Sequence, residues 1–294
     1  MPLGGSVLET NPGLVDTTFR GLRSTFETAL EGGVDESWKE IAMPVPGTTK
    51  KEAYRFITDM PGMKKWFGNR ISDGWKIEAL EIENVPYEET IEIDEFDLDD
   101  DTAGLFAPIV SQLGLEAARM PAEIVYGHLE AGFTTNSYDG TTFFSDSHAF
   151  GDNKTTSALD AAPLEAGILA MKSFTTSSGR KLGINRTIKL LVPFALRAAA
   201  EELVGNRFLT DGTNNPNFGV AQIVVADTLT DANDWFLIGS NGILRPLMFQ
   251  ERMAPRTRRD DSKVFDKHKI FWGVDARWGV AYALPQMAYG AKVT

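Results

Sequence analysis

An acidic segment in which apolar and charged residues alternate, from Trp75 to Asp101, most strongly restricts how this chain can fold. The alternation runs on both sides of Asn84-Val85-Pro86, a sequence typical of a turn. The pattern predicts a β-hairpin, with a register slip near Leu80 that is compatible with a bulge. Twelve residues of the segment are acidic and only Lys76 is basic. Because a lone two-stranded ribbon is marginally stable and like charges repel across strands, the hairpin is expected to lie on another surface, such as a neighbouring subunit.

A long helix is predicted directly after the hairpin. Asp101 or Thr102 can cap its N-terminus, and apolar residues recur every three or four positions over 105–124. With Gly132 just beyond its end, the helix covers 103–131. Pro121 is expected to kink this helix or split it in two, because proline has no N–H for the helical hydrogen bond.

The remaining segments mix helices and strands. A short amphipathic helix near the N-terminus carries Phe19 and Phe26 on its apolar face, and a second helical stretch is expected in 53–72. Further helices are expected at 163–174 and 193–204, and strands at 188–192, 219–225, 235–239, 245–250, 268–275 and 278–289. Because no regular strand–helix–strand alternation is present, the predicted class is α+β.

Composition argues against several classes of function. The formal net charge of −12 argues against a nucleic-acid reader, because such proteins bind phosphates through Lys and Arg. The sequence has no cysteine, so disulfides and thiolate chemistry are absent. The sequence shows neither a secretory signal nor a stretch long enough to span a membrane. We therefore expect a protein that is made in and used from the cytoplasm.

Catalytic chemistry finds little support in the residue pattern. His128 is expected on a helix surface, and His148, near Asp146, is expected to be a hydrogen-bonding loop residue rather than a metal ligand. The run Asp97-Leu-Asp-Asp-Asp101 could bind a divalent cation, but the preference of helix N-termini for Asp explains it more simply. No catalytic residue, cofactor or metal site is predicted. The alternative from another class is a metal-dependent hydrolase that uses this acidic cluster.

A basic segment provides a counterpart to the acidic one. Gln250-Glu-Arg-Met-Ala-Pro-Arg-Thr-Arg-Arg259 contains four arginines and is expected to be a loop. One interpretation is an ordinary solvated loop. The other is a contact between subunits, in which the acidic hairpin of one copy meets the basic loop of the next. On the second interpretation, replacing Arg256, Arg258 and Arg259 by Glu is expected to weaken assembly.

Several short pieces, spread along nearly the whole chain, together resemble the major head (capsid) subunit of Mu-like tailed phages and prophages. Their order and spacing carry the resemblance more than any one piece. Residue 149 is Ala where the family pattern has Pro, and 151–185 matches only loosely. The matching pieces are Met63-Lys-Lys-Trp-Phe-Gly-Asn-Arg70, Asp99-Asp-Asp-Thr-Ala-Gly-Leu-Phe-Ala-Pro108, Tyr138-Asp-Gly-Thr-Thr-Phe-Phe144 with His148, Leu191-Val-Pro193, Trp235-Phe-Leu237, Gln250-Glu-Arg252 with Pro255, and Gly273-Val-Asp275 with Arg277.

The resemblance implies the Hong Kong 97-type capsid fold. It has an N-terminal arm, an extended β-hairpin loop that lies over the adjacent subunit, a peripheral domain with a long spine helix, and an axial domain. Placed on this sequence, these parts are the arm 1–50, the extended-loop region with the acidic hairpin 51–102, the peripheral domain with the spine helix 103–154, the axial domain 155–255, and the return to the peripheral domain 256–294.

The resemblance also implies a function. Family members assemble with themselves into pentamers and hexamers of an icosahedral head around packaged double-stranded DNA, with help from a scaffold, a maturation protease and a portal. The chain is thus expected to be a non-enzymatic capsid protein of the virion, assembled in the host bacterial cytoplasm, without sequence-specific DNA binding or a membrane partner. A decoration protein is an optional further partner in this family, and the sequence does not say whether this chain binds one. Because the sequence starts at Met1, the scaffold is expected to be a separate protein.

An alternative within the same fold is a nanocompartment shell that encloses an enzyme. On either interpretation the important residues are those that contact neighbouring subunits. The predicted interface residues are Phe19, Phe26, Trp75, Tyr87, Glu88, Glu89, Arg252, Arg256, Arg258 and Arg259.

Overall fold

The computed structural model describes residues 12–293 except 60–75, 100–103, 176–178, 184–186, 210, 241 and 243. The chain divides into two compact units, each built from three separate segments. The first unit contains 1–36, 84–121 and 251–279, and the second contains 37–83, 122–250 and 280–294.

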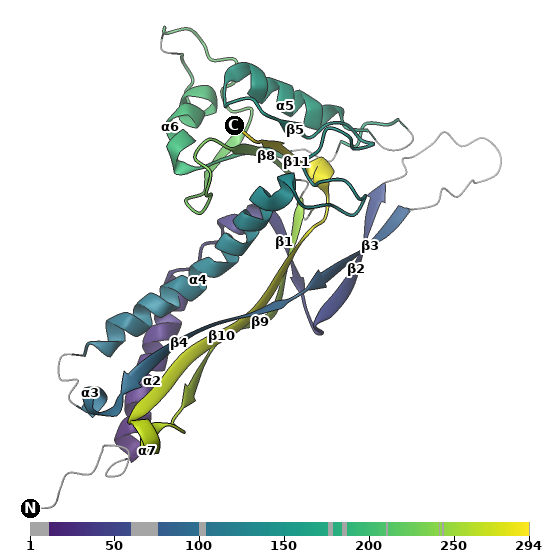
Figure 1. The fold of residues 1–294 in the computed structure, drawn as a ribbon. Helices are drawn as coiled ribbons and strands as arrows, with labels where there is room; N and C mark the ends of the chain where they lie inside the picture. The colour runs from purple at the N-terminus through teal and green to yellow at the C-terminus, as the bar shows by residue number, and fades with distance from the viewer. Residues whose placement is uncertain are drawn as a thin grey trace, which may run out of the picture. The chain divides into compact units, whose positions relative to one another are not determined.

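Long strands, the helix α2, the first part of the long helix α4 and two short helices form the described part of the first unit. Its strands β4, β10 and β9 lie side by side in that order, so β10 is central (Figure 1). The elements are α2 (Pro12–Gly32), β4 (Val85–Asp94), α3 (Glu95–Asp99), the first part of α4 (Phe106–Glu130), most of β9 (Leu247–Asp260), α7 (Val264–Lys267) and most of β10 (Lys269–Tyr282).

The core of this unit lies between the helices and one face of the sheet. Residues three or four apart on α2, including Phe26, pack with α4 residues and with alternate residues of β10. The Phe26 ring meets Trp272 edge to face at 5.8 Å. The helices approach closely at Gly114, where a Cβ atom would lie 2.7 Å from the carbonyl oxygen of Phe26. A glycine is therefore required at this crossing.

The second unit is built on a five-stranded sheet with the order β5-β11-β8-β6-β7. Its central strands are buried on both faces, and α5 packs on the same core through Leu164 and Met171. The elements are η1 (Ser37–Glu40), β1 (Ala42–Pro46), β2 (Lys51–Asp59), β3 (Lys76–Glu83), η2 (Ala131–Phe133), β5 (Lys154–Thr155), α5 (Ala161–Ser173), β6 (Thr187–Val192), η3 (Phe194–Leu196), α6 (Arg197–Ala200), η4 (Glu201–Gly205), β7 (Gln222–Val225), β8 (Trp235–Ser240), η5 (Pro285–Met287) and β11 (Ala288–Ala291).

The acidic segment does not form the predicted hairpin. Its first half, β3, pairs antiparallel with β2, and its second half, β4, pairs antiparallel with β10. The buried Asn84 separates the two halves. Pairing β3 with β4 would bring two rows of carboxylates together, whereas β2 and β10 each supply lysines. Lys51 Nζ lies 3.0 Å from Glu83, and Lys269 Nζ lies 3.0 Å from Glu92.

Other predicted elements need smaller corrections. The long helix is confirmed as α4, and Pro121 lies inside it without splitting it. The helix expected in 53–72 is wrong for 53–59, which belongs to β2, and the rest of that range lies outside the described residues. The basic segment is part of the strand β9 rather than a loop, because alternating residues of it pack on the sheet.

The two final strands also differ from the prediction. β10 continues as one strand from Lys269 to Tyr282, and β11 joins the five-stranded sheet by pairing with β8. The division into arm, extended loop, peripheral domain and axial domain stays a prediction.

Candidate assembly surfaces

One face of the first unit's sheet is charged and the other is buried. In β10 the buried residues alternate from Ile270 to Trp278, and the residues between them are half-buried and face the opposite side. The register places Glu88 opposite Asp275 and Asp94 opposite Lys269. We call this side the charged face, which consists of Arg252, Arg256 and Arg258 on β9, Lys269, Asp275 and Arg277 on β10, and Glu88, Glu92 and Asp94 on β4.

Ion pairs cross the charged face between neighbouring strands. Arg256 Nε lies 3.8 Å from Asp275 Oδ2, and Arg258 pairs with the same oxygen. Lys269 Nζ lies 3.0 Å from Glu92 Oε1 and 3.6 Å from Asp94 Oδ2. The hydrogen bond to Glu92 and the nearby carboxylates raise the pKa of Lys269. The sequence predicted that the acidic segment of one copy meets the basic segment of another. In the structure, β4 of the acidic segment and β9 of the basic segment already lie in one sheet of the same copy.

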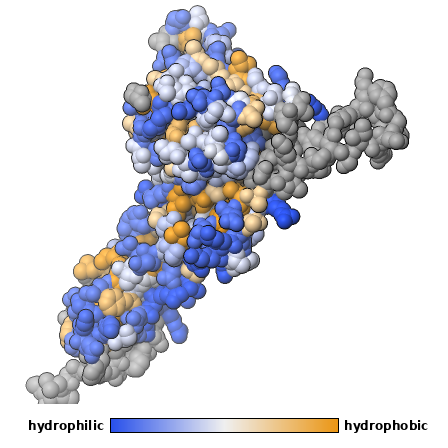
Figure 2. Space-filling view, turned by 45° about the vertical axis from the view of Figure 1, so that its right-hand side comes forward, coloured by the Kyte–Doolittle hydropathy of each residue, from blue (hydrophilic) through white to orange (hydrophobic). Residues whose placement is uncertain are grey.

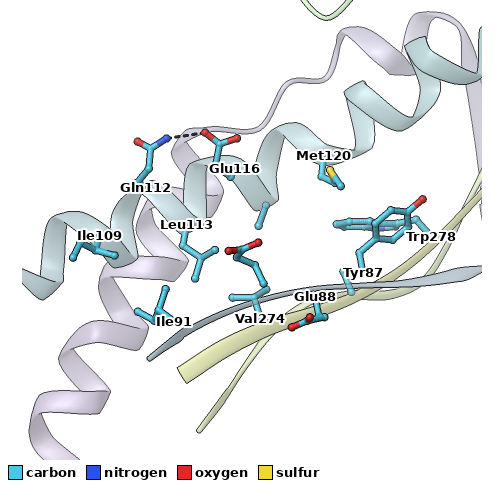
Figure 3. A pocket seen from close by; sticks show the side chains of 13 residues that line it. Tyr87, Glu88, Ile91, Ile109, Gln112, Leu113, Glu116, Met120, Val274 and Trp278 are labelled. Atoms are coloured by element: carbon cyan, nitrogen blue, oxygen red, sulfur yellow. Dashed lines mark hydrogen bonds between the residues drawn. The ribbon is translucent and has the colours of Figure 1, made fainter. Parts of the chain in front are cut away.

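An apolar groove lies on the other side of this sheet, between α4 and β4. It has a volume of about 470 Å³ and is lined by both elements and by β10. Ile109, Leu113 and Met120 of α4 face Tyr87 and Ile91 across it, whereas Glu88 points to the opposite side of the sheet (Figure 3). Ile109 is 49% exposed, so one copy leaves apolar surface in the groove open to water.

The end of the groove is formed by two aromatic residues. The Tyr87 and Trp278 rings lie 5.5 Å apart, and burial raises the pKa of the Tyr87 hydroxyl. Gln112 Nε2 donates a hydrogen bond of 2.7 Å to Glu116 Oε1 on α4 (Figure 3). The groove therefore has an apolar floor with polar groups beside it. The described residues that line it form no arrangement of nucleophile, acid and base that would indicate catalysis.

The structure places the predicted interface residues in different surroundings. Phe19 and Phe26 are 6% and 1% exposed and pack in the core of their own chain, so one copy does not offer them at its surface, and their role at an interface stays a prediction. Trp75 lies outside the described residues. Glu88 and Glu89 are exposed on β4, and Tyr87 is half-buried beside them.

The four arginines are exposed on β9, but most have partners within the chain. Arg256 and Arg258 pair with Asp275. Arg259 Nη2 lies 2.7 Å from Asp261, and its guanidinium lies 4.7 Å from the Phe19 ring centre. Within the part of the chain that the structure describes, Arg252 has no carboxylate within ion-pair distance.

A polar network at the base of the β2–β3 ribbon was missed by sequence reasoning. The fully buried Gln250 donates to the Tyr54 hydroxyl at 2.8 Å and to Glu52 Oε2 at 3.1 Å. Glu52 also accepts from the Thr48 hydroxyl and backbone N–H and from Tyr54, and these hydrogen bonds lower its pKa to about 2. The network fixes the start of β2 against β9. Its members are far apart in sequence, so no local pattern signals it.

Exposed aromatic residues in the second unit were also missed. Phe194, Phe208 and Phe218 are each more than half exposed, as is Leu169 on α5. The face drawn in Figure 2 is mainly hydrophilic with separate hydrophobic patches. Arg197 and Arg207 lie over the rings of Phe194 and Phe208 at 5.7 and 5.9 Å.

The histidines show no catalytic arrangement. His148 bonds Asp139 at 2.6 Å and Thr141 at 2.9 Å, so it is a structural residue, but its partner is Asp139 rather than Asp146. His128 is not a surface residue as predicted, since it stacks on Tyr282 at 4.1 Å and burial lowers its pKa to about 4. Among the described residues, no three His, Asp or Glu side chains gather as metal ligands, and no helix is both long and apolar enough to span a membrane.

Comparison with known proteins decides the family. The family model described as Mu-like prophage major head subunit gpT matches residues 15–158, 155–229 and 226–294. The chain belongs to this family. It is thus a structural protein of the phage head class rather than an enzyme, as the sequence predicted.

Two curated relatives agree with this assignment. The chain is 29% identical over 286 residues to the Mu-like prophage FluMu major head subunit of Haemophilus influenzae, covering 96% of this chain and 74% of that protein. It is 25% identical over 282 residues to the major capsid protein of Escherichia phage Mu, covering 94% of this chain and 73% of that protein.

Solved structures confirm the predicted fold class. The procapsid subunit of bacteriophage JBD30 aligns with a TM-score of 0.58 at 20% identity, covering 96% of this chain and 75% of that chain. A virus-like particle from Pyrococcus furiosus aligns with a TM-score of 0.55 at 11% identity, covering 92% of this chain and 98% of that chain. The major head subunit therefore has the α+β capsid fold of the Hong Kong 97 type.

Proposed function

We propose that the chain assembles with copies of itself into pentamers and hexamers that close an icosahedral head around double-stranded DNA. The match of one head-subunit family along residues 15–294 carries this proposal. The charged face, the open groove and the exposed aromatic residues supply surfaces that a neighbouring copy can cover. A closed shell follows when many such contacts repeat by symmetry.

The remaining features of the head follow the family. A scaffold, a maturation protease and a portal assist assembly in the host bacterial cytoplasm, and a decoration protein binds the outside of the finished virion. DNA is enclosed without sequence-specific binding, which agrees with the net charge of −12 because an acidic wall does not hold phosphates.

The interface residues that remain candidates are those exposed to solvent. Tyr87, Glu88 and Glu89 lie along β4 beside the groove, and four arginines lie along β9. Every one of these residues lies on the first unit, so we assign the charged part of the subunit contact to that unit.

A second function uses the same fold. A shell that encloses an enzyme instead of DNA would need the same contacts between copies, so the fold alone does not separate the two functions. The content of the particle separates the two functions.

Purified protein tests the proposal directly. After expression with and without the neighbouring head genes of its source, lysates are fractionated by sedimentation and imaged by electron microscopy. Closed shells of uniform diameter are expected. Nuclease-protected DNA in particles from the complete gene set supports a phage head, whereas an enclosed enzyme supports the compartment. Subunits that stay monomeric or form only irregular aggregates under both conditions would contradict the proposal.

A further inference from the structure

We infer that the β4 edge of one copy binds the β9 edge of a second copy, head to tail, through opposite charges on the charged face. This inference rests on the proposed function, because it names how copies of the chain meet. The three strands β4, β10 and β9 form an ordered sheet, so β4 and β9 lie on opposite sides of β10. One edge is acidic and the other is basic.

The charges on the two edges are not balanced within one copy. On the central strand, Asp275 is neutralised by Arg256 and Arg258, and Lys269 is neutralised by Glu92 and Asp94. Glu88 lies directly opposite Asp275, and it accepts a hydrogen bond of 2.8 Å from the Thr90 hydroxyl. Among the described residues, this carboxylate has no cation within ion-pair distance, and Glu89 is exposed at the same edge on the groove side.

The β9 edge has the opposite excess. Arg252 has no carboxylate partner within the described residues, and Arg256 and Arg258 share a single carboxylate. Two guanidinium groups on one carboxylate leave a net positive charge at this edge. Opposite excess charges at opposite edges repel equivalent edges and attract unlike ones.

Both edges are accessible in one copy. No described strand pairs with β4 on the side away from β10. On β9, the neighbour β1 has only five residues, and Leu247 N–H donates to Ile41 O at 3.2 Å beside its start. At about 3.3 Å per residue, β1 ends well before Arg256. Among the described strands, none pairs with the basic half of β9 on the side away from β10.

Pro255 restricts how the edges can meet. It lies in the middle of the basic half of β9 and has no backbone N–H to donate. A continuous ladder of backbone hydrogen bonds between copies would be interrupted there. We therefore assign the contact to side chains, with arginines of β9 against Glu88 on the charged face and against Glu89, which lies on the groove side of the same edge.

The geometry of such a contact is directional. A surface at one edge meets a different surface at the other edge, so each copy can bind two neighbours, one on each side. A head-to-tail contact of this kind builds rings, as pentamers and hexamers require. It differs from a two-fold dimer, in which the same surface is used twice.

Charge reversal at each edge tests the inference. The first variant carries Glu88→Arg and Glu89→Arg, so both of its edges are basic. The second carries Arg252→Glu and Arg256→Glu, so both of its edges are acidic, and Arg258 is kept to neutralise Asp275. Arg23→Glu, on the exposed side of α2, is the matched control. Circular dichroism and thermal unfolding first establish that every variant is folded.

Association is then measured by sedimentation velocity, for each variant alone and for an equimolar mixture. Each edge variant alone is expected to lose at least about tenfold in the associated fraction, whereas the mixture recovers association and the control is unchanged. Raising the salt concentration should reduce association of the mixture. Folded edge variants that associate as well as the native chain, or a mixture that does not recover association, would overturn the inference.

The mixture also separates this inference from the proposed function. If the native chain forms no shells but the two edge variants associate only when mixed, the result supports the head-to-tail contact and contradicts the proposed shell. If the native chain forms shells and the mixture shows no recovery, the shell stands and the contact lies elsewhere.

Discussion

The two main sheets of this subunit differ in how much of their surface is covered within one copy. In the second unit, β8 is buried along its whole length and β6 is buried except at its first residue. In the first unit, β10 alternates between buried and half-buried residues, and the outer half of β9 is mostly exposed. The sheet of the second unit is therefore complete by itself, whereas the sheet of the first unit leaves charges, an edge and a groove for another copy.

The largest expected effect concerns the fully covered sheet. Trp235 on β8 is 0% exposed, and its indole N–H donates to the Ser157 carbonyl at 3.0 Å. Trp235→Ala should lower the free energy of unfolding by about 3 to 5 kcal/mol, measured by urea denaturation. Phe208→Ala is the control because that ring is 56% exposed, and it should change stability by less than about 0.5 kcal/mol. If the two variants lowered the free energy of unfolding equally, the proposed difference between covered and exposed positions in this unit would be contradicted.

The second effect is a pH dependence of the buried histidine in the second unit. Burial lowers the pKa of His128 to about 4, and among the described residues its Nε2 atom has no hydrogen-bond partner. Because this pKa lies below the unfolded value of about 6.5, the contribution to stability is complete above pH 6.5 and is lost as the pH falls towards 4. The loss is on the order of 3 kcal/mol.

His128→Phe tests this dependence by removing the titrating group while keeping an aromatic ring beside Tyr282. Thermal unfolding of both proteins is followed from pH 7 to 4. The difference in stability between the native chain and the variant should change steadily across this range. A constant difference would show that His128 does not stay neutral in the folded state.

The third effect compares two glycines of one helix. Gly114 lies against α2, so Gly114→Ala should destabilise the first unit by about 1 to 3 kcal/mol through overpacking. Gly127, also on α4, has no atom within 4 Å of the added Cβ, so Gly127→Ala should be neutral or stabilise by up to about 1 kcal/mol. Chemical denaturation measures both. Destabilisation of equal size would mean that the α2–α4 crossing is not closely packed.

The smallest effect on folding is expected on the charged face. Arg258 is 62% exposed at its side chain, so its pair with Asp275 is screened by water, and Arg258→Ala should cost less than about 1 kcal/mol. Thermal unfolding at low and high salt measures the change. A loss above about 2 kcal/mol would mean that these charges serve the fold of one copy rather than contacts between copies.

Local patterns predicted the helices better than the strand partners. The spacing of apolar residues found α4 because the residues that define a helix face are near in sequence. The same reasoning paired β3 with β4 across Asn84, where the true partners are β2 and β10. Alternation shows which residues of a strand share a face, but it does not show which strand pairs with it. The partner of β4 is β10, which begins at Lys269, far away in the sequence, so no local pattern identifies it.

The candidate surfaces were predictable only in part. Glu88, Glu89 and the β9 arginines were found because charged residues cluster visibly in the sequence. Phe19 and Phe26 were assigned to an interface because an apolar helix face does not show whether its own chain covers it. The groove beside β4 could not be predicted, because it depends on the spacing between α4 and the sheet, which the sequence does not show.

The order in which the chain is synthesised gives the packing of Phe26 on Trp272 a further consequence. The core of the first unit joins a helix near the beginning of the chain to a strand near its end. Residues in α2 and β4 therefore leave the ribosome long before β10, and both wait for their β10 contacts until synthesis is nearly finished. The acidic edge exists as a rigid surface only at that point. We therefore expect this edge to recruit neighbours only after β10 has been synthesised and has paired with β4.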